Sequence, residues 1–228
     1  MKTQHIAAAI LALAASAAQA DPFAITYTST ATGSGIPGIN DQQFTLTLVM
    51  DVDGDTAINE SWGGGALTCA IWRMNDAANV VIAHDLTISA PAPATGHVRT
   101  DGGGVLTEVF AQVGSVGAVP PAAVRATGLA PGYALANWFA GPAQARVLYA
   151  TDANNNYHYF SDLAGSVQMT PARWSNPVPF AGNCLDAAGP ASAGGNIAAV
   201  PTLGHAALAL LGALVGGLGL RGQRRKQS

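Results

Sequence analysis

FTLTLVMDV, residues 44–52, carries the clearest structural pattern in this 228-residue chain. Every even-numbered position in it is apolar, whereas Thr45, Thr47 and Asp51 occupy odd-numbered positions. Successive side chains of a β-strand point to opposite faces of the sheet. The alternation therefore predicts a strand with one face on a hydrophobic core and the other toward solvent.

Similar short segments, separated by turn residues, continue along the chain. We expect further strands at residues 24–30, 67–74, 80–89, 105–113, 133–139, 144–151 and 167–170. The Asn-rich turn at 152–156 predicts a hairpin over residues 146–160. Strands at this spacing, without a long amphipathic helix, indicate a single all-β domain over 21–184, built as an antiparallel β-sandwich. Residues 185–199 are rich in Gly, Ala and Pro and are expected to form a flexible stalk.

The N-terminus has the pattern of a secretory signal peptide over residues 1–20. Lys2 gives a basic start, residues 6–15 are apolar, and Ala18-Gln19-Ala20 is a small-x-small cleavage site. We therefore expect the body of the protein to be exported.

The C-terminus has the pattern of a membrane anchor. Residues 203–220 are 18 consecutive residues without a formal charge. As a helix they would span roughly 27 Å, close to the hydrocarbon thickness of a bilayer. The basic residues that follow should stay cytoplasmic: Arg221, Arg224, Arg225 and Lys226. We expect a transmembrane helix with the body outside the inner membrane.

The tetrad Val200, Pro201, Thr202 and Leu203 leads into this apolar segment, whose first residue is Leu203. The tetrad, the short helix and the basic end resemble the IPTL-CTERM variant of the PEP-CTERM-type sorting tails of bacterial exosortase substrates. The second half-motif differs, because Gly204, His205 and Ala206 stand where the family usually has a Ser, an acid and a Trp. The resemblance implies that a membrane-embedded protease of exosortase type recognises and removes the tail. It also implies exopolysaccharide as a partner and the cell surface or extracellular matrix as the destination. The alternative is a permanent single-pass anchor.

The charge of the exported body restricts its partners. Five arginines and no lysine stand against 13 acidic residues, which gives a net charge of −8. An acidic, lysine-free surface argues against binding to nucleic acid or to anionic lipid.

Cys69 and Cys184 are the two cysteines of the chain, and both lie in the exported body. An oxidising compartment favours a disulfide between them. The alternative is a pair of buried free thiols.

Asp51, Asp53 and Asp55 resemble the first half of a calcium-binding loop. The EF-hand pattern then fails, because Thr56 replaces the Gly at position six and Trp62 replaces the Glu at position twelve. We interpret the segment as an acidic turn and expect no metal site and no cofactor.

No motif supplies a catalytic site. A Gly-x-Ser-x-Gly elbow and metal-like His/Cys spacing are both absent from the sequence. His84 shares a strand face with Ile82 and Leu86, which predicts a core histidine. We therefore expect a non-enzymatic surface or matrix protein.

The alternative from another class is a carbohydrate-binding module or a weak glycan-acting enzyme. Sugar rings stack on exposed aromatic side chains, and Trp62 and Trp174 are the tryptophans expected to be most exposed. Trp62 lies beside three glycines, and Trp174 lies in a Pro-flanked loop. The competing interpretation is that both are core aromatics.

Overall fold

The computed structural model describes residues 22–34, 40–51, 56–74, 80–89, 94–115, 119–129, 134–150, 157–162 and 169–188. The chain divides into two units, Met1–Ala193 and Gly194–Ser228, and all described residues belong to the first. The expected signal peptide, the sorting tail and residues 189–199 of the expected stalk lie outside the described residues. Among the described residues, no helix is long and apolar enough to cross a membrane.

The described part of the chain is all-β, as the sequence predicts, with four short 3-10 turns. The strands are β1 (Phe23–Ser34), β2 (Gln43–Met50), β3 (Ser61–Gly63), β4 (Leu67–Met74), β5 (Val81–Asp85), β6 (His97–Thr100), β7 (Leu106–Glu108), β8 (Val113–Gly114), β9 (Val124–Thr127), β10 (Ala134–Ala140), β11 (Ala145–Ala150), β12 (Tyr157–Asp162) and β13 (Val178–Pro179). The turns are η1 (Gly64–Ala66), η2 (Pro121–Ala123), η3 (Pro171–Arg173) and η4 (Leu185–Ala188).

These strands form one large and one small antiparallel sheet. The large sheet has the order β8-β10-β11-β12-β1-β2-β4-β5-β9, with β13 also paired to β1. The small sheet has the order β3-β6-β7. The pairing of β11 with β12 confirms the predicted hairpin.

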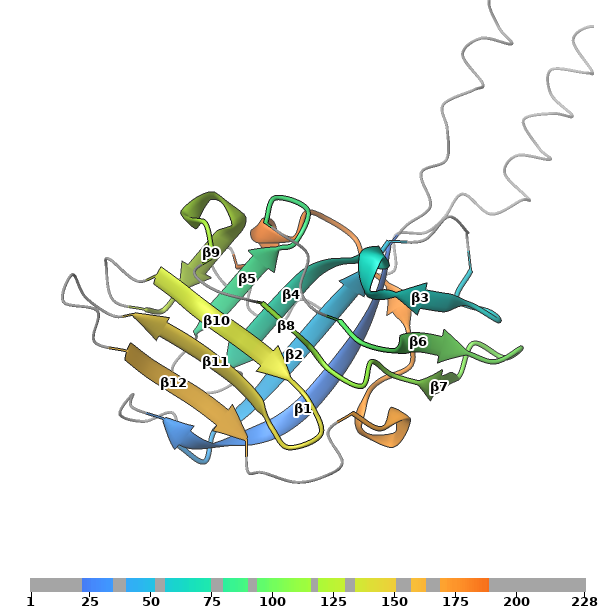
Figure 1. Ribbon diagram of the computed structural model, residues 1–228, viewed down its shortest axis with the longest axis horizontal. Helices are drawn as coiled ribbons and strands as arrows, with labels where there is room; N and C mark the ends of the chain where they lie inside the picture. The colour runs from blue at the N-terminus through green and yellow to red at the C-terminus, as the bar shows by residue number, and fades with distance from the viewer. Residues whose placement is uncertain are drawn as a thin grey trace, which may run out of the picture. The chain divides into compact units, whose positions relative to one another are not determined.

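The large sheet curls into two layers because β1 belongs to both of them. Its first part pairs with β2, from Phe23 to Thr30, and its last part pairs with β12, from Ala31 to Ser34. Figure 1 shows β10, β11 and β12 in front of β2, β4 and β5. We call β8, β10, β11 and β12 the front layer, and the first part of β1 with β2, β4, β5 and β9 the back layer. The predicted sandwich is thus correct in having two layers, but a single curled sheet supplies both.

The main core lies between the two layers. The side chains of Phe44, Leu46, Leu48 and Met50 on β2 are all 0% exposed, as their period-two spacing predicts. Val52, the last apolar position of that pattern, lies outside the described residues. From β4, Trp72 meets Trp138 of β10 edge to face, with ring centroids 6.3 Å apart. Large aromatic rings therefore join the two layers.

The back layer also buries a smaller apolar set on its outer face. This outer-face patch consists of Ala24, Val49, Cys69, Ile71, Val81 and Ala83. Residues between Phe180 and Ala188 pack against it. Strands β4 and β5 are buried on both faces, which explains their nearly continuous apolar sequences.

Several expectations about element boundaries are wrong. Residues 86–89 and 169–170, expected to belong to strands, form turns and bends. The strand expected at 105–113 is two short strands, β7 and β8, and the buried side chains of Val109 and Phe110 lie between them. Residues 185–188, expected to begin the stalk, form η4 on the back layer instead. The reason is tertiary, because the disulfide at Cys184 holds this Ala-rich turn against the sheet.

Candidate functional site

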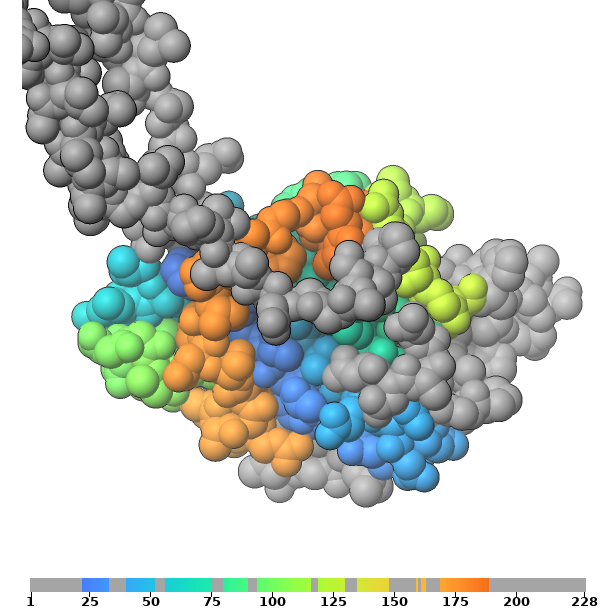
Figure 2. Space-filling view, turned by 180° about the vertical axis from the view of Figure 1, so that it is seen from behind, coloured from blue at the N-terminus to red at the C-terminus, as the bar shows by residue number. Residues whose placement is uncertain are grey.

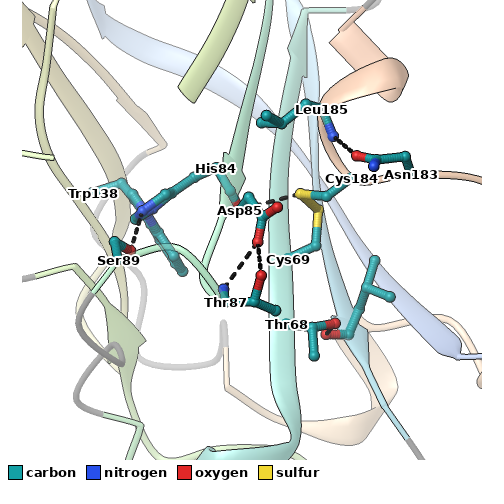
Figure 3. Close-up of a disulfide and its surroundings, with 11 residues drawn as sticks. Thr68, Cys69, His84, Asp85, Thr87, Ser89, Trp138, Asn183, Cys184 and Leu185 are labelled. Carbon is teal, nitrogen blue, oxygen red and sulfur yellow. Dashed lines mark hydrogen bonds between the residues drawn. A yellow bond between two sulfur atoms is a disulfide. The ribbon is translucent and has the colours of Figure 1, made fainter. Parts of the chain in front are cut away.

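The predicted disulfide between Cys69 and Cys184 is confirmed. It joins β4, in the middle of the back layer, to the residue before η4, across a sequence separation of 115 (Figure 3). Cys184 Sγ also lies 3.2 Å from the backbone oxygen of His84. A disulfide sulfur carries no proton, so this approach is a contact rather than a hydrogen bond. The bridge therefore ties the end of the body to its centre.

His84 on β5 is buried, and its two ring nitrogens have different partners. Trp138 Nε1 donates to His84 Nδ1 at 2.8 Å, and His84 Nε2 lies 2.8 Å from Ser89 Oγ (Figure 3). An indole N–H can only donate, so Nδ1 is the acceptor and the proton of the neutral ring sits on Nε2. His84 Nε2 then donates to Ser89. The predicted core histidine is confirmed, with only 1% of its surface exposed.

The surroundings of His84 keep its ring neutral and fix its tautomer. Burial lowers its pKa from 6.5 to about 4, and nearby Asp85 opposes this shift. Asp85 directs its carboxylate to Thr87 instead, accepting from Thr87 Oγ1 at 2.6 Å and from the Thr87 amide at 2.9 Å. A general base for Ser89 would need an unprotonated Nε2. The hydrogen bond from Trp138 holds the opposite tautomer.

A second polar cluster lies where β1 passes from one layer to the other. Tyr27 donates its hydroxyl proton to Asp162 Oδ2 at 2.5 Å, and the Ala145 amide donates to Asp162 Oδ1 at 2.7 Å. Arg173 Nη2 donates to the Tyr27 oxygen at 3.2 Å, and the Trp174 ring lies 5.5 Å from the Tyr27 ring. Burial and the hydrogen bond to Asp162 raise the pKa of Tyr27. The cluster links β1, β11, β12 and η3, so it stabilises the crossing between the layers. The sequence analysis did not find it, because these residues are far apart in the chain and belong to no motif.

Both tryptophans expected to be exposed are buried, so that expectation is wrong. Trp62 is 3% exposed and packs 6.2 Å from the Phe23 ring, and Trp174 is 7% exposed. Of the glycines beside Trp62, Gly64 permits close packing, since a Cβ on it would lie 2.8 Å from that of Ala94. Neither tryptophan presents a free ring face to a sugar.

Of the acidic residues proposed for a half calcium loop, Asp51 lies within the described residues and Asp53 and Asp55 lie outside them. The Asp51 amide donates to the Ala66 oxygen at 2.8 Å, where β2 ends. Within the described ranges, no group of three or more His, Cys, Asp or Glu side chains could hold a metal ion.

Comparison with known families identifies the C-terminal region. The family model of the IPTL-CTERM motif matches residues 198–225. The match includes Val200, Pro201, Thr202 and Leu203 and the basic positions up to Arg225, so the resemblance of the tail is confirmed. No curated protein and no solved structure matches the chain.

Proposed function

We propose that this chain is an exported protein, sorted through its C-terminal tail, that acts without catalysis at the cell surface or in the extracellular matrix. The observation that carries this proposal is the IPTL-CTERM motif at residues 198–225. A signal peptide at residues 1–20 would start export, and the apolar segment 203–220 would hold the tail in the inner membrane with the body outside.

The body has properties that suit this destination. Its Cys69–Cys184 bridge would persist in an oxidising compartment. Its net charge of −8 without a lysine would keep it away from anionic lipid.

The proposal of a non-enzymatic body is supported by how the buried polar groups are used. His84 is neutral at pH 7 and donates to Ser89 rather than accepting from it. Asp162 accepts from Tyr27 and from a backbone amide. The His84 ring and the Asp162 carboxylate both take part in hydrogen bonds that join different strands.

The partner in sorting would be a membrane-embedded protease of exosortase type, which removes the tail near the Val200–Leu203 tetrad. The sorting experiment expresses the full chain in a host with a matching enzyme and measures the mass of the mature protein. Pro201→Ala should leave the chain uncleaved in the inner membrane, and Pro190→Ala, outside the motif, should be processed normally. Recovery of the wild-type chain with its tail intact would contradict removal of the tail and favour a permanent membrane anchor.

A role for exopolysaccharide follows from the resemblance of the tail and is the narrower part of the proposal. Tyr159 on β12 has an exposed aromatic side chain, at 45%. Co-sedimentation of the mature protein with host exopolysaccharide, for wild type and Tyr159→Ala, would test it. Loss of sedimentation in the variant would support a glycan-binding body. Absence of sedimentation in both proteins would remove the polysaccharide from the proposal.

A further inference from the structure

The last described residues cross the outer face of the back layer as a strap. We call residues 181–188 the C-terminal strap. Figure 2 shows the C-terminal segment, in orange, lying over the strands seen from behind. The strap is joined to the strands by the disulfide, one hydrogen bond and one ion pair: Cys184–Cys69, Arg73 Nη2 to the Ala187 oxygen at 2.9 Å, and Arg125 Nη1 to Asp186 Oδ1 at 3.0 Å.

The non-covalent part of this attachment is weak. The side chains of Arg125 and Asp186 are 51% and 72% exposed, and ion pairs at such exposure contribute little to stability. Ala188 is buried but small, and Leu185 and Ala187 are half-buried. Fixing eight backbone residues costs conformational entropy. The hydrogen bond, the exposed ion pair and the burial of the outer-face patch offset this cost only in part. The strap therefore depends on the bridge.

The core between the layers does not depend on the strap. Its large side chains, such as Trp72, Trp138 and Phe44, point to the inner face, away from the strap. The strap packs against small and β-branched side chains of the outer-face patch. Loss of the strap would expose this patch and leave the contacts between the layers in place.

We propose that the Cys69–Cys184 bridge is a redox latch that holds the C-terminal strap on the back layer, so that reduction releases the strap while the two-layer core stays folded. The reductant is a dithiol. One of its thiolates attacks the half-buried Cys184 sulfur, and Cys69 leaves as a thiolate and takes up a proton. The second thiol then attacks the mixed disulfide, which yields the Cys184 thiol and oxidises the dithiol to a disulfide.

One consequence rests on the proposed function, whereas the latch itself does not. With the latch closed, 11 residues, 189–199, separate the body from Val200. With the strap released, 19 residues, 181–199, separate them. At about 3.5 Å per extended residue, the maximum reach rises from about 38 Å to about 66 Å. The redox state of the bridge would thus set how far the sorting tetrad can lie from the body.

Amide hydrogen exchange, followed by mass spectrometry on the full chain in detergent micelles, tests the latch directly. The oxidised protein is compared with protein reduced by dithiothreitol and with the Cys69→Ala/Cys184→Ala variant. We expect peptides covering 181–188 to exchange at least ~10-fold faster in both bridge-free forms, as for a locally unfolded segment. Peptides covering β2 and β10 should keep their protection.

Arg125→Gln is the matched control, because it removes the strap's ion pair and keeps the bridge. Its strap should exchange as in the wild type. Undiminished strap protection after reduction would overturn the proposal, and so would simultaneous loss of protection in the strap, β2 and β10, since the bridge would then hold the whole fold. Neither result depends on whether the tail is processed, which the Pro201→Ala experiment tests separately.

Discussion

The two faces of the back layer are stabilised in different ways, although the same strands form both. The inner face carries Phe44 and Trp72, which pack in the core between the back layer and the front layer. The outer face carries Ala24, Val49 and Ile71, and a strap of eight residues covers them. Large buried aromatics remove much apolar surface from water, whereas a strap over small and β-branched side chains removes less. A covalent bond is therefore most useful on the outer face.

The largest effect that would sharpen this comparison is expected in the core between the inner face and the front layer. Trp138→Ala removes the ring that meets Trp72 and the donor to His84 Nδ1. We expect a loss of about 3–5 kcal/mol in the free energy of unfolding, measured in urea. Tyr159→Ala, on the same layer but exposed, should cost less than about 0.5 kcal/mol. Similar losses in the two variants would mean that the inner core is not the main source of stability.

The second effect tests the outer face. Cys69→Ala/Cys184→Ala removes the bridge and should lower the free energy of unfolding by about 2–4 kcal/mol, because the unfolded chain is no longer cross-linked. Urea unfolding of oxidised wild type and variant measures it. In the wild type, both cysteines should resist alkylation until they are reduced. Rapid alkylation of the native, unreduced protein would contradict the bridge.

The third effect is pH-dependent and arises on the inner face. The pKa of His84 is lowered from 6.5 to about 4 by burial, so the unfolded chain takes up the proton first. The stability that the neutral ring contributes is present above pH 6.5 and is lost as the pH falls toward 4, by at most about 3 kcal/mol. Stability measured between pH 7.5 and 4 should fall less steeply in His84→Gln than in the wild type. Parallel curves would show that His84 does not titrate in this range.

The smallest effect concerns the ion pair of the strap. Arg125→Gln removes the partner of Asp186, and both side chains are more than half exposed. We expect less than about 1 kcal/mol of destabilisation, and still less in 1 M salt, since exposed charges are screened. Urea unfolding at two salt concentrations measures this. A loss as large as that of the cysteine variant would mean that the ion pair, rather than the bridge, holds the outer face.

The local sequence pattern predicted which side chains of a strand face the core. The spacing of Phe44, Leu46, Leu48 and Met50 set the inner face of β2, because side-chain direction in a strand follows from position alone. The face shared by His84 and Ile82 predicted a core histidine for the same reason.

The burial of Trp62 and Trp174 could not be predicted in this way. Glycines beside Trp62 suggested an exposed loop, but one of them, Gly64, permits close packing against Ala94. Trp174 is buried because η3 places it on Tyr27, which is 147 positions earlier in the chain. Neither contact is marked by a periodic pattern of residues in the sequence.

The sequence by itself determined the all-β class, the cysteine pair and the sorting motif at the C-terminus, since each depends on residue type, spacing or compartment. Only the tertiary structure decided that β1 serves both layers, that Asp162 accepts from Tyr27, and that residues 185–188 belong to the body. The physical reason is that these features depend on contacts between distant segments. The contacts that stabilise these features, by burial and cross-linking, form only in the folded chain. A short stretch of sequence does not contain both partners of such a contact.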